Sequence, residues 1–194
     1  MRGQSLSGLK TRRKMMAKNK GKVFEDDFAS SIDKNTILLH RLKDTAQSYN
    51  QSEDTKYTWQ NPCDYFIFNG KMLFCLELKS TKSKSISYQQ NKNDKTQRMI
   101  KWHQIEKLTE FSNYKNVLAG FVLNYRDEKN NVQRTYFLNI KDFNKIRLST
   151  NKHSVNEIDI LLNNAVKING HIKKMHWHWD IDEFLESQIT KYIN

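Results

Sequence analysis

The sequence predicts an α/β domain in which helices flank a mixed β-sheet. Short apolar or alternating stretches, such as residues 65–68, 71–79 and 117–125, indicate strands. Stretches with apolar residues on one face of a 3.6-residue repeat, such as residues 23–32, indicate helices. The two kinds follow one another as helix, strand, hairpin, helix, two strands and further helices, an order typical of this class.

The elements can be placed in chain order. In the first helix, residues 23–32, Phe24, Phe28 and Ile32 share one face. The pair Asn69-Gly70 is a strong hairpin signal and joins two of the predicted strands. The other predictions are a strand over 36–42, a polar excursion over 43–61, a loop over 80–98, a helix over 100–111, strands over 117–125 and 133–138, and helices over 141–146, 155–166 and 180–192.

The length and composition suit one domain with appendages. A chain of 194 residues can bury a core, but the hydrophobic share of 37% indicates that part of it is not packed. We expect a basic, disordered arm over residues 1–20 and a core over 21–147 that carries the excursion. Residues 148–194 are expected to form a helical C-terminal extension of the same domain.

The charge of the chain favours a polyanionic partner. The formal net charge is +12 and the pI is about 9.6, which makes nucleic acid the first candidate and an anionic membrane surface the second. Residues 1–22 carry eight Lys or Arg and no acidic residue, so this arm is either a solvated tail or a segment that pairs with phosphates. The residues expected to contact phosphates are Arg12, Arg13, Lys14, Lys82, Lys84, Lys95, Arg98 and Lys101.

The sequence does not support a membrane-spanning, secreted or disulfide-stabilised protein. No stretch is long and apolar enough to cross a membrane, and no apolar run follows the basic start as in a secretory signal. Cys63 and Cys75 show neither metal-ligand spacing nor a disulfide framework, so we expect a reducing, cytoplasmic setting. Near the end of the chain, His171, His176 and His178 can bind a transition metal if that piece is a strand, but an aromatic edge packed beside the last helix is the simpler interpretation.

The candidate chemistry lies around the Asn69-Gly70 hairpin. Side chains alternate along a strand, so Glu77 and Lys79 share one face, about 7 Å apart. The hairpin folds the strand of Asp64 back beside them, within the error of the strand register. An exposed ion pair is the usual meaning of an isolated Glu-x-Lys. With Asp64 beside it, the set offers two hard oxygen ligands for Mg²⁺ and a lysine that can hold or deprotonate a water, as phosphodiester hydrolysis requires.

These residues stand in an ordered series that resembles a known family. The spacing between Asp64 and Glu77, the Glu77-Leu78-Lys79 tripeptide, the basic stretch after it, Gly21-Lys22-Val23-Phe24-Glu25, and His103-Gln104-Ile105 are similar to the core of restriction-endonuclease-like nucleases, and within them to RecU-type Holliday junction resolvases. The similarity spans roughly residues 20–147. It implies a restriction-endonuclease-like mixed sheet flanked by helices, and a nuclease core over 21–147.

The resemblance also implies roles for residues. Asp64 and Glu77 are expected to bind Mg²⁺, for which Mn²⁺ can substitute, and Glu25 to complete the acidic cluster. Lys79 is expected to position the attacking water, and Gln104 to support the site or the scissile phosphate. The family implies a homodimer that acts on branched DNA with no membrane, with a stalk at the position of residues 43–61.

The sequence also departs from the family. The basic segment 89–98 is longer, the stalk-like segment is shorter, and residues 150–194 extend past the family core. Two alternatives therefore stay open: another nuclease of the superfamily, site-specific, flap-directed or mismatch-directed, and a non-catalytic DNA-binding protein. A basic RNA-binding accessory protein is a third possibility.

Overall fold

The computed structural model of the chain describes residues 20–42 and 61–193. The predicted basic arm, with Arg12, Arg13 and Lys14, and nearly all of the excursion over 43–61 lie outside these residues.

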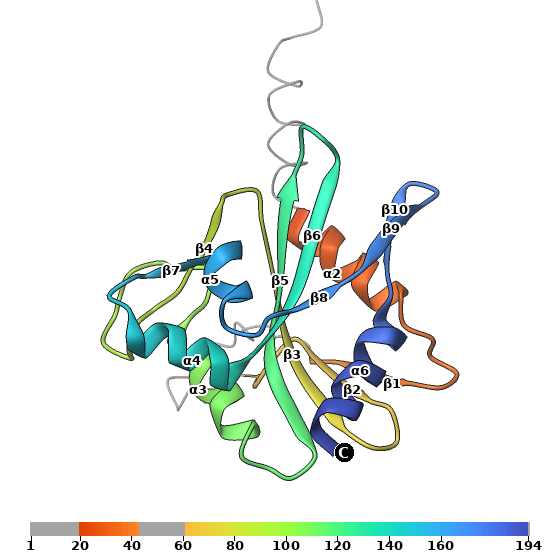
Figure 1. Cartoon of the computed structure of the whole chain (residues 1–194), viewed down its shortest axis with the longest axis horizontal. Helices are drawn as coiled ribbons and strands as arrows, with labels where there is room; N and C mark the ends of the chain where they lie inside the picture. Colours follow the sequence, from red (N-terminus) through yellow and green to blue (C-terminus); the bar gives the residue numbers. More distant parts are fainter. Residues whose placement is uncertain (1–19, 43–60, 194) are drawn as a thin grey trace, which may run out of the picture.

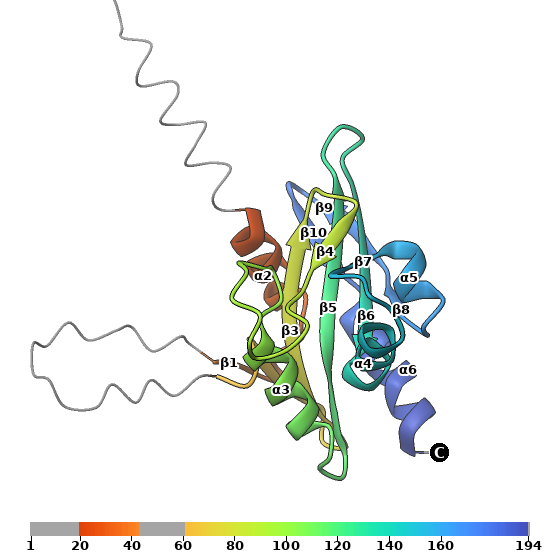
Figure 2. The ribbon, with the colours of Figure 1, turned by 90° about the vertical axis from the view of Figure 1, so that its left-hand side faces the viewer.

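A six-stranded mixed sheet forms the centre of the molecule. Its strand order is β1-β2-β3-β5-β6-β8. Strands β3 and β5 are parallel and every other neighbouring pair is antiparallel; Figure 2 shows β3, β5 and β6 side by side. The bounds are β1 Leu38–Arg41, β2 Tyr65–Phe68, β3 Leu73–Thr81, β5 Val117–Asp127, β6 Val132–Asn139 and β8 Val166–Ile168.

Helices and small strand pairs cover both faces of this sheet (Figure 1). One layer contains α3 (Trp102–Phe111), α4 (Ile140–Ser149), α5 (Glu157–Leu161), and the pair formed by β4 (Ser85–Ser87) and β7 (Ser154–Asn156). The other contains α2 (Lys20–Ser30), α6 (Ile181–Ile193), and the ribbon formed by β9 (Gly170–Lys173) and β10 (His176–Trp179). The predicted fold class, a mixed sheet flanked by helices, is confirmed.

The alternation of side chains along β3 divides the core in two. Phe74, Leu76 and Leu78 belong to the hydrophobic cluster under α2 and α6. Cys75 belongs to the cluster under α3 and α4, and Glu77 follows it on that face of the strand. Strand β3 therefore carries Glu77 on the side of α3, with Lys79 two residues further along the same face.

The turn between β2 and β3 sets the register of this hairpin. Gly70 has φ +87°, a conformation open to glycine, and the Asn69 side-chain oxygen accepts hydrogen bonds from the backbone N–H groups of Lys71 and Met72. The connection is longer than predicted, because β3 begins at Leu73. Tyr65 pairs with Leu76, which fixes where the start of β2 meets β3.

Two stretches differ from their predicted structure. The predicted loop over residues 80–98 contains β4, with Ile86 and Tyr88 fully buried. The stretch from 148, predicted to be helical, holds β7, β8, β9 and β10 besides α5 and α6, and β8 completes the central sheet. These strands have three or four residues and several pair with distant segments, so hydrophobic periodicity gives little local signal for them.

Candidate active site

Asp64 and Glu77 face each other across the β2–β3 ribbon. Asp64 directly precedes β2, and the register that pairs Tyr65 with Leu76 places it opposite Glu77. Its backbone N–H donates to the carbonyl of Leu76 at 3.1 Å. Its carboxylate accepts a hydrogen bond from the backbone N–H of Leu78 at 2.7 Å. The side chain thus takes the place of a backbone acceptor for β3 beyond the start of β2. The Asp64 carboxylate also lies close enough to Glu77 to raise the pKa of that residue, so the two acids meet at this end of the ribbon.

Lys79 completes the pair that the tripeptide predicts. Its Nζ donates to Oε1 of Glu77 at 2.7 Å. Only 3% of the Glu77 side chain and 18% of the Lys79 side chain are exposed. This is a largely buried ion pair at the end of a ribbon, not an exposed surface pair.

Gln104 reaches the same carboxylate from α3. Its Nε2 donates to Oε1 of Glu77, and its own Oε1 accepts the backbone N–H of Lys101 at 2.9 Å. The second bond belongs to the cap at the start of α3, and it orients the amide so that the nitrogen faces the site. The structure thus brings Gln104 to Glu77, as expected of a supporting residue.

Glu25 approaches from the other layer. It lies on α2 and its Oε2 accepts a hydrogen bond from Nη2 of Arg41 at 2.6 Å. Burial, and next the nearby charge of Asp64, raise the pKa of Glu25, while Arg41 opposes the shift. Glu25 is therefore an electrostatic neighbour of Asp64 that is held by Arg41, a residue that the sequence did not single out. Arg41 ends the β-rich segment before the excursion, and nothing in the sequence pattern marks it.

Burial and neighbouring charges shift the pKa values of the Glu77 and Lys79 side chains. Burial raises the pKa of Glu77 to about 7, with Lys79 opposing the shift and Asp64 adding to it. Burial by itself disfavours the charged form of Lys79, but Glu77 and then Asp64 outweigh it and raise the pKa of the amine. In this arrangement the Lys79 ammonium donates to the Glu77 carboxylate.

The donors suit a hard divalent cation. Asp64 and Glu77 offer carboxylate oxygens, and Mg²⁺ binds through one or two carboxylates while it keeps several waters. A cation beside them would offset the raised pKa of Glu77. Among the described residues, no three His, Cys, Asp or Glu side chains are grouped closely enough to hold an ion by themselves. Glu25, expected as a third acid, makes its ion pair with Arg41.

The described basic side chains that are expected to meet phosphates lie on three segments, after β3, after β4 and at the start of α3. Lys82 and Lys84 are exposed in the connection after β3, and Lys101 is exposed at the start of α3. Lys95 and Arg98 lie in the segment after β4, exposed and half-buried respectively. Lys82 and Lys84 also line a cleft of about 650 Å³ beyond the end of β3, together with the β5–β6 hairpin and the start of α5.

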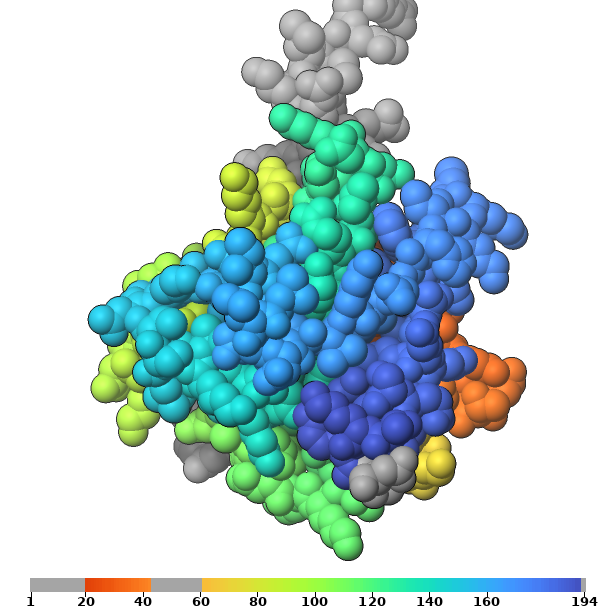
Figure 3. Space-filling model, viewed as in Figure 1, coloured from red at the N-terminus to blue at the C-terminus, as the bar shows by residue number. Residues whose placement is uncertain are grey.

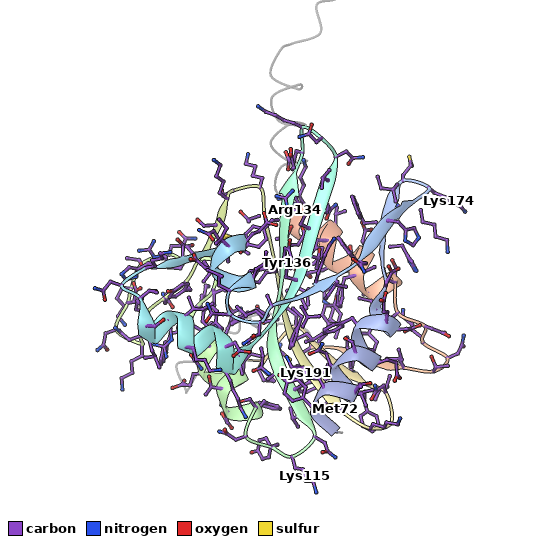
Figure 4. The ribbon with its side chains drawn as sticks, viewed as in Figure 1. Met72, Lys115, Arg134, Tyr136, Lys174 and Lys191 are labelled. Carbon is purple, nitrogen blue, oxygen red and sulfur yellow. The ribbon has the colours of Figure 1, made fainter. Side chains whose placement is uncertain are left out.

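In this cleft, Arg134 donates to both carboxylate oxygens of Glu157, at 2.7 and 2.9 Å. This pair forms part of the cleft wall near Tyr136, whose hydroxyl also donates to Glu157 (Figure 4). Because Arg134 is held in this way, the exposed lysines are the cations of the cleft best placed to meet a ligand.

The cysteines and histidines make different contacts. Cys63 and Cys75 are buried free thiols with Sγ atoms 2.9 Å apart, and burial raises the pKa of Cys63, so this thiol is not a thiolate nucleophile. His176 and His178 do lie in a strand, β10, but Nδ1 of His176 is 2.9 Å from Oδ1 of Asp27.

No described helix is long and apolar enough to cross a membrane.

The fold and the site define an α/β protein with a carboxylate, lysine and glutamine centre at the end of a β-ribbon. The chain belongs to the family of the SPbeta prophage-derived uncharacterized protein YotM of Bacillus subtilis (strain 168), to which it is 33% identical over 168 residues, 83% of this chain and 80% of that protein. No protein-family model matches the sequence. Among solved structures, Hjc of Archaeoglobus fulgidus, a Holliday junction resolvase, aligns with 76% of this chain and 95% of its own, at 17% identity and a TM-score of 0.46.

Proposed function

We propose that this protein is a Mg²⁺-dependent endonuclease of the restriction-endonuclease-like superfamily that resolves four-way DNA junctions. The observation that carries the proposal is the meeting of Asp64, Glu77, Lys79 and Gln104 at the end of the β2–β3 ribbon. Burying the Glu77 carboxylate costs desolvation free energy, and two donors, Lys79 and Gln104, meet one of its oxygens. An ordinary surface ion pair has no such burial, so this arrangement indicates a functional site.

The side chains have distinct tasks in this proposal. Asp64 and Glu77 hold the ion, and Lys79 and Gln104 fix the orientation of the Glu77 carboxylate from two sides. When bound, Mg²⁺ supplies neutralisation of charge on the scissile phosphate and an activated water. The Lys79 ammonium stabilises negative charge on the phosphate, and Glu25, positioned by Arg41, completes the acidic border of the site.

The charge around the site supports DNA as the substrate. Lys82, Lys84 and Lys101 are exposed on the elements that border it, and the whole chain has a net charge of +12. We propose that Lys95, Arg98 and the arm with Arg12, Arg13 and Lys14 add further phosphate contacts. Because such contacts release condensed counterions, binding should weaken steeply as salt rises.

The preference for a junction and the homodimer rest on the resemblance of the sequence to RecU-type resolvases. Two symmetric sites in a dimer would cut paired strands of a four-way junction in the cytoplasm. A substrate panel tests this: a labelled mobile junction, a flap, a linear duplex and a single strand are each incubated with and without Mg²⁺. Preferred, Mg²⁺-dependent nicking of the junction supports the proposal, and preference for a flap or a linear duplex favours another nuclease of the superfamily.

A non-catalytic DNA-binding protein is the alternative of a different class. It predicts that all four DNA substrates stay intact in Mg²⁺ and in Mn²⁺ although the protein binds them. The largely buried arrangement of Glu77, Lys79 and Gln104 favours the enzyme.

A further inference from the structure

The β9–β10 ribbon stands out from the body of the protein. Figure 3 shows residues 170–179 projecting from the body of the protein, and Figure 1 shows β9 and β10 next to α2. Figure 4 shows Lys174 at the outer end, pointing away from the sheet. The strands pair from Gly170 with Trp179 to Lys173 with His176, so Lys174 and Met175 form the two-residue tip. Met175 is 91% exposed.

The base of the ribbon is firmly attached. Trp179 is buried, and its ring lies edge-on to Phe24 of α2 at 5.8 Å. A side chain at Gly170 would collide with the Trp179 ring, which shows how closely the two strands pack there. The ribbon is therefore fixed to the core at its inner end.

Hydrogen bonds attach the outer edge of β10 to α2 and to Ser31, the residue that follows this helix. The backbone N–H of Trp177 donates to the Asp27 carboxylate at 3.2 Å, and that of Trp179 donates to the Ser31 hydroxyl at 2.9 Å. His176 contacts the same carboxylate. Since Glu25 borders the proposed active site from the same helix, α2 connects the ribbon with the site.

The free part of the ribbon is cationic. Opposed pairs share a face, so one face carries Trp177 and Trp179 against the core together with the exposed Ile172. The other face carries His171, Lys173, His176 and His178. No Asp or Glu occurs in residues 160–179. The exposed face and tip thus offer Lys173 and Lys174 as cations, with imidazoles between them and the base.

The tip keeps long side chains where a turn favours small ones. Lys174 has φ +61°, a left-handed conformation that Gly or Asn adopts more readily. A hairpin under selection for stability alone would place one of those residues there. An exposed lysine and methionine in this turn point to contact with a partner.

We infer that the β9–β10 ribbon is a DNA-binding element: Lys173 and Lys174 pair with phosphates, and Met175 packs against bases that a distorted or branched duplex exposes. Two-stranded ribbons bind in the major or the minor groove of DNA, and in minor-groove complexes apolar side chains such as Met act as wedges between base steps. The inference rests on the proposed function in that it takes DNA as the substrate.

The test measures binding of a labelled four-way junction and a linear duplex in EDTA, where no cleavage occurs. Lys173→Ala/Lys174→Ala should weaken binding by at least roughly tenfold at 0.1 M salt and lower the salt slope by about 1.8. The matched control is Lys71→Ala/Lys115→Ala, which removes the same charge from two exposed turns; Lys115 lies at the opposite end of the molecule (Figure 4).

Met175→Ala tests the wedge separately. If Met175 unstacks bases, binding of the wild type raises the fluorescence of 2-aminopurine placed at the junction centre. Met175→Ala should abolish this rise without changing the salt slope. Leu148→Ala, at another exposed apolar position, should leave the rise intact. Circular dichroism checks that each variant is folded.

Three results would overturn the inference. The first is that Lys173→Ala/Lys174→Ala weakens DNA binding no more than Lys71→Ala/Lys115→Ala does. The second is dependence on the tip for sedimentation with phosphatidylserine vesicles but not for DNA binding. The third is a change of oligomeric state caused by Met175→Ala. Cleavage by the wild type in Mg²⁺, measured in parallel, separates failure of this inference from failure of the proposed function.

Discussion

Gln104 donates its side-chain N–H to the buried carboxylate of Glu77 from a helix that lies 27 positions further along the chain. The contact joins the first turn of α3 to the end of the β2–β3 ribbon, and the cap at Lys101 fixes its direction. The hydrogen bond thus connects the start of α3, where Lys101 is exposed, with the Glu77 carboxylate that we propose binds the ion.

Replacing Gln104 should therefore impair turnover more than folding. Gln104→Leu removes the donor while keeping a similar volume, and we expect roughly 10- to 100-fold slower junction cleavage, the range for residues that orient metal ligands. Single-turnover rates in Mg²⁺ measure the effect. Glu110→Gln, at an exposed position of the same helix, is the control. An unchanged rate for Gln104→Leu would remove it from the site.

Glu25 can be tested against its neighbour in sequence. Glu25→Gln removes the charge that borders Asp64, and we expect about tenfold or greater loss of cleavage with little change in DNA binding. Asp26→Asn, one residue on and exposed, should leave the rate near that of the wild type. If both variants cleave equally well, the Glu25–Arg41 pair is structural.

Mg²⁺ binding should depend on pH through Glu77. Folding raises the pKa of this carboxyl from 4.5 to about 7. Its neutral form therefore stabilises the metal-free fold below about pH 4.5, and this contribution is lost as the pH rises through about 7. Because the ion requires the carboxylate, its apparent affinity should be roughly tenfold higher at pH 8 than at pH 6.

Thermal unfolding with and without Mg²⁺ at both pH values measures this dependence. The increase in Tm that Mg²⁺ produces should be larger at pH 8, and Glu77→Gln should abolish it at both. A Mg²⁺-induced shift that is equal at pH 6 and pH 8 would exclude Glu77 as the titrating ligand.

The centre of the sheet gives a stability prediction. A Cβ at Gly120 of β5 would lie 2.4 Å from the Leu138 carbonyl oxygen and 2.7 Å from the Phe137 ring. Gly120→Ala should lower the free energy of unfolding by about 2–3 kcal/mol. Gly21→Ala in α2, where nothing lies within 4 Å, should leave it unchanged or raise it by up to about 1 kcal/mol. Urea unfolding measures both, and equal effects would contradict the packing described for β5.

The sequence predicted the ribbon and the acidic pair because both follow from local rules. Alternation separated Phe74 and Leu76 from Cys75 and Glu77, and the Asn69-Gly70 turn set the approach of Asp64. The helix over 180–192 also corresponds to α6, with Phe184 buried.

What the sequence missed depends on contacts between distant segments. Ile86 of β4 pairs with Val155 of β7, and Phe137 of β6 pairs with Val166 of β8. The strands β4, β7 and β8 have three residues each, too few for a detectable repeat. The role of Arg41 could not be predicted because its ion pair with Glu25 joins two segments that the fold brings together. The tip at Lys174 and Met175 lacks the small residues that mark a hairpin turn, so this ribbon was not predicted.

Cleavage of a labelled mobile four-way junction by Asp64→Asn tests the central claim most directly. Asparagine keeps an oxygen that can accept the Leu78 N–H, but it removes the charge that the ion needs. The control is Asp182→Asn at an exposed position of α6. We predict Mg²⁺-dependent nicking by the wild type and the control, and at least roughly 10³-fold slower nicking by Asp64→Asn with junction binding retained. Nicking by Asp64→Asn at the wild-type rate would contradict the account.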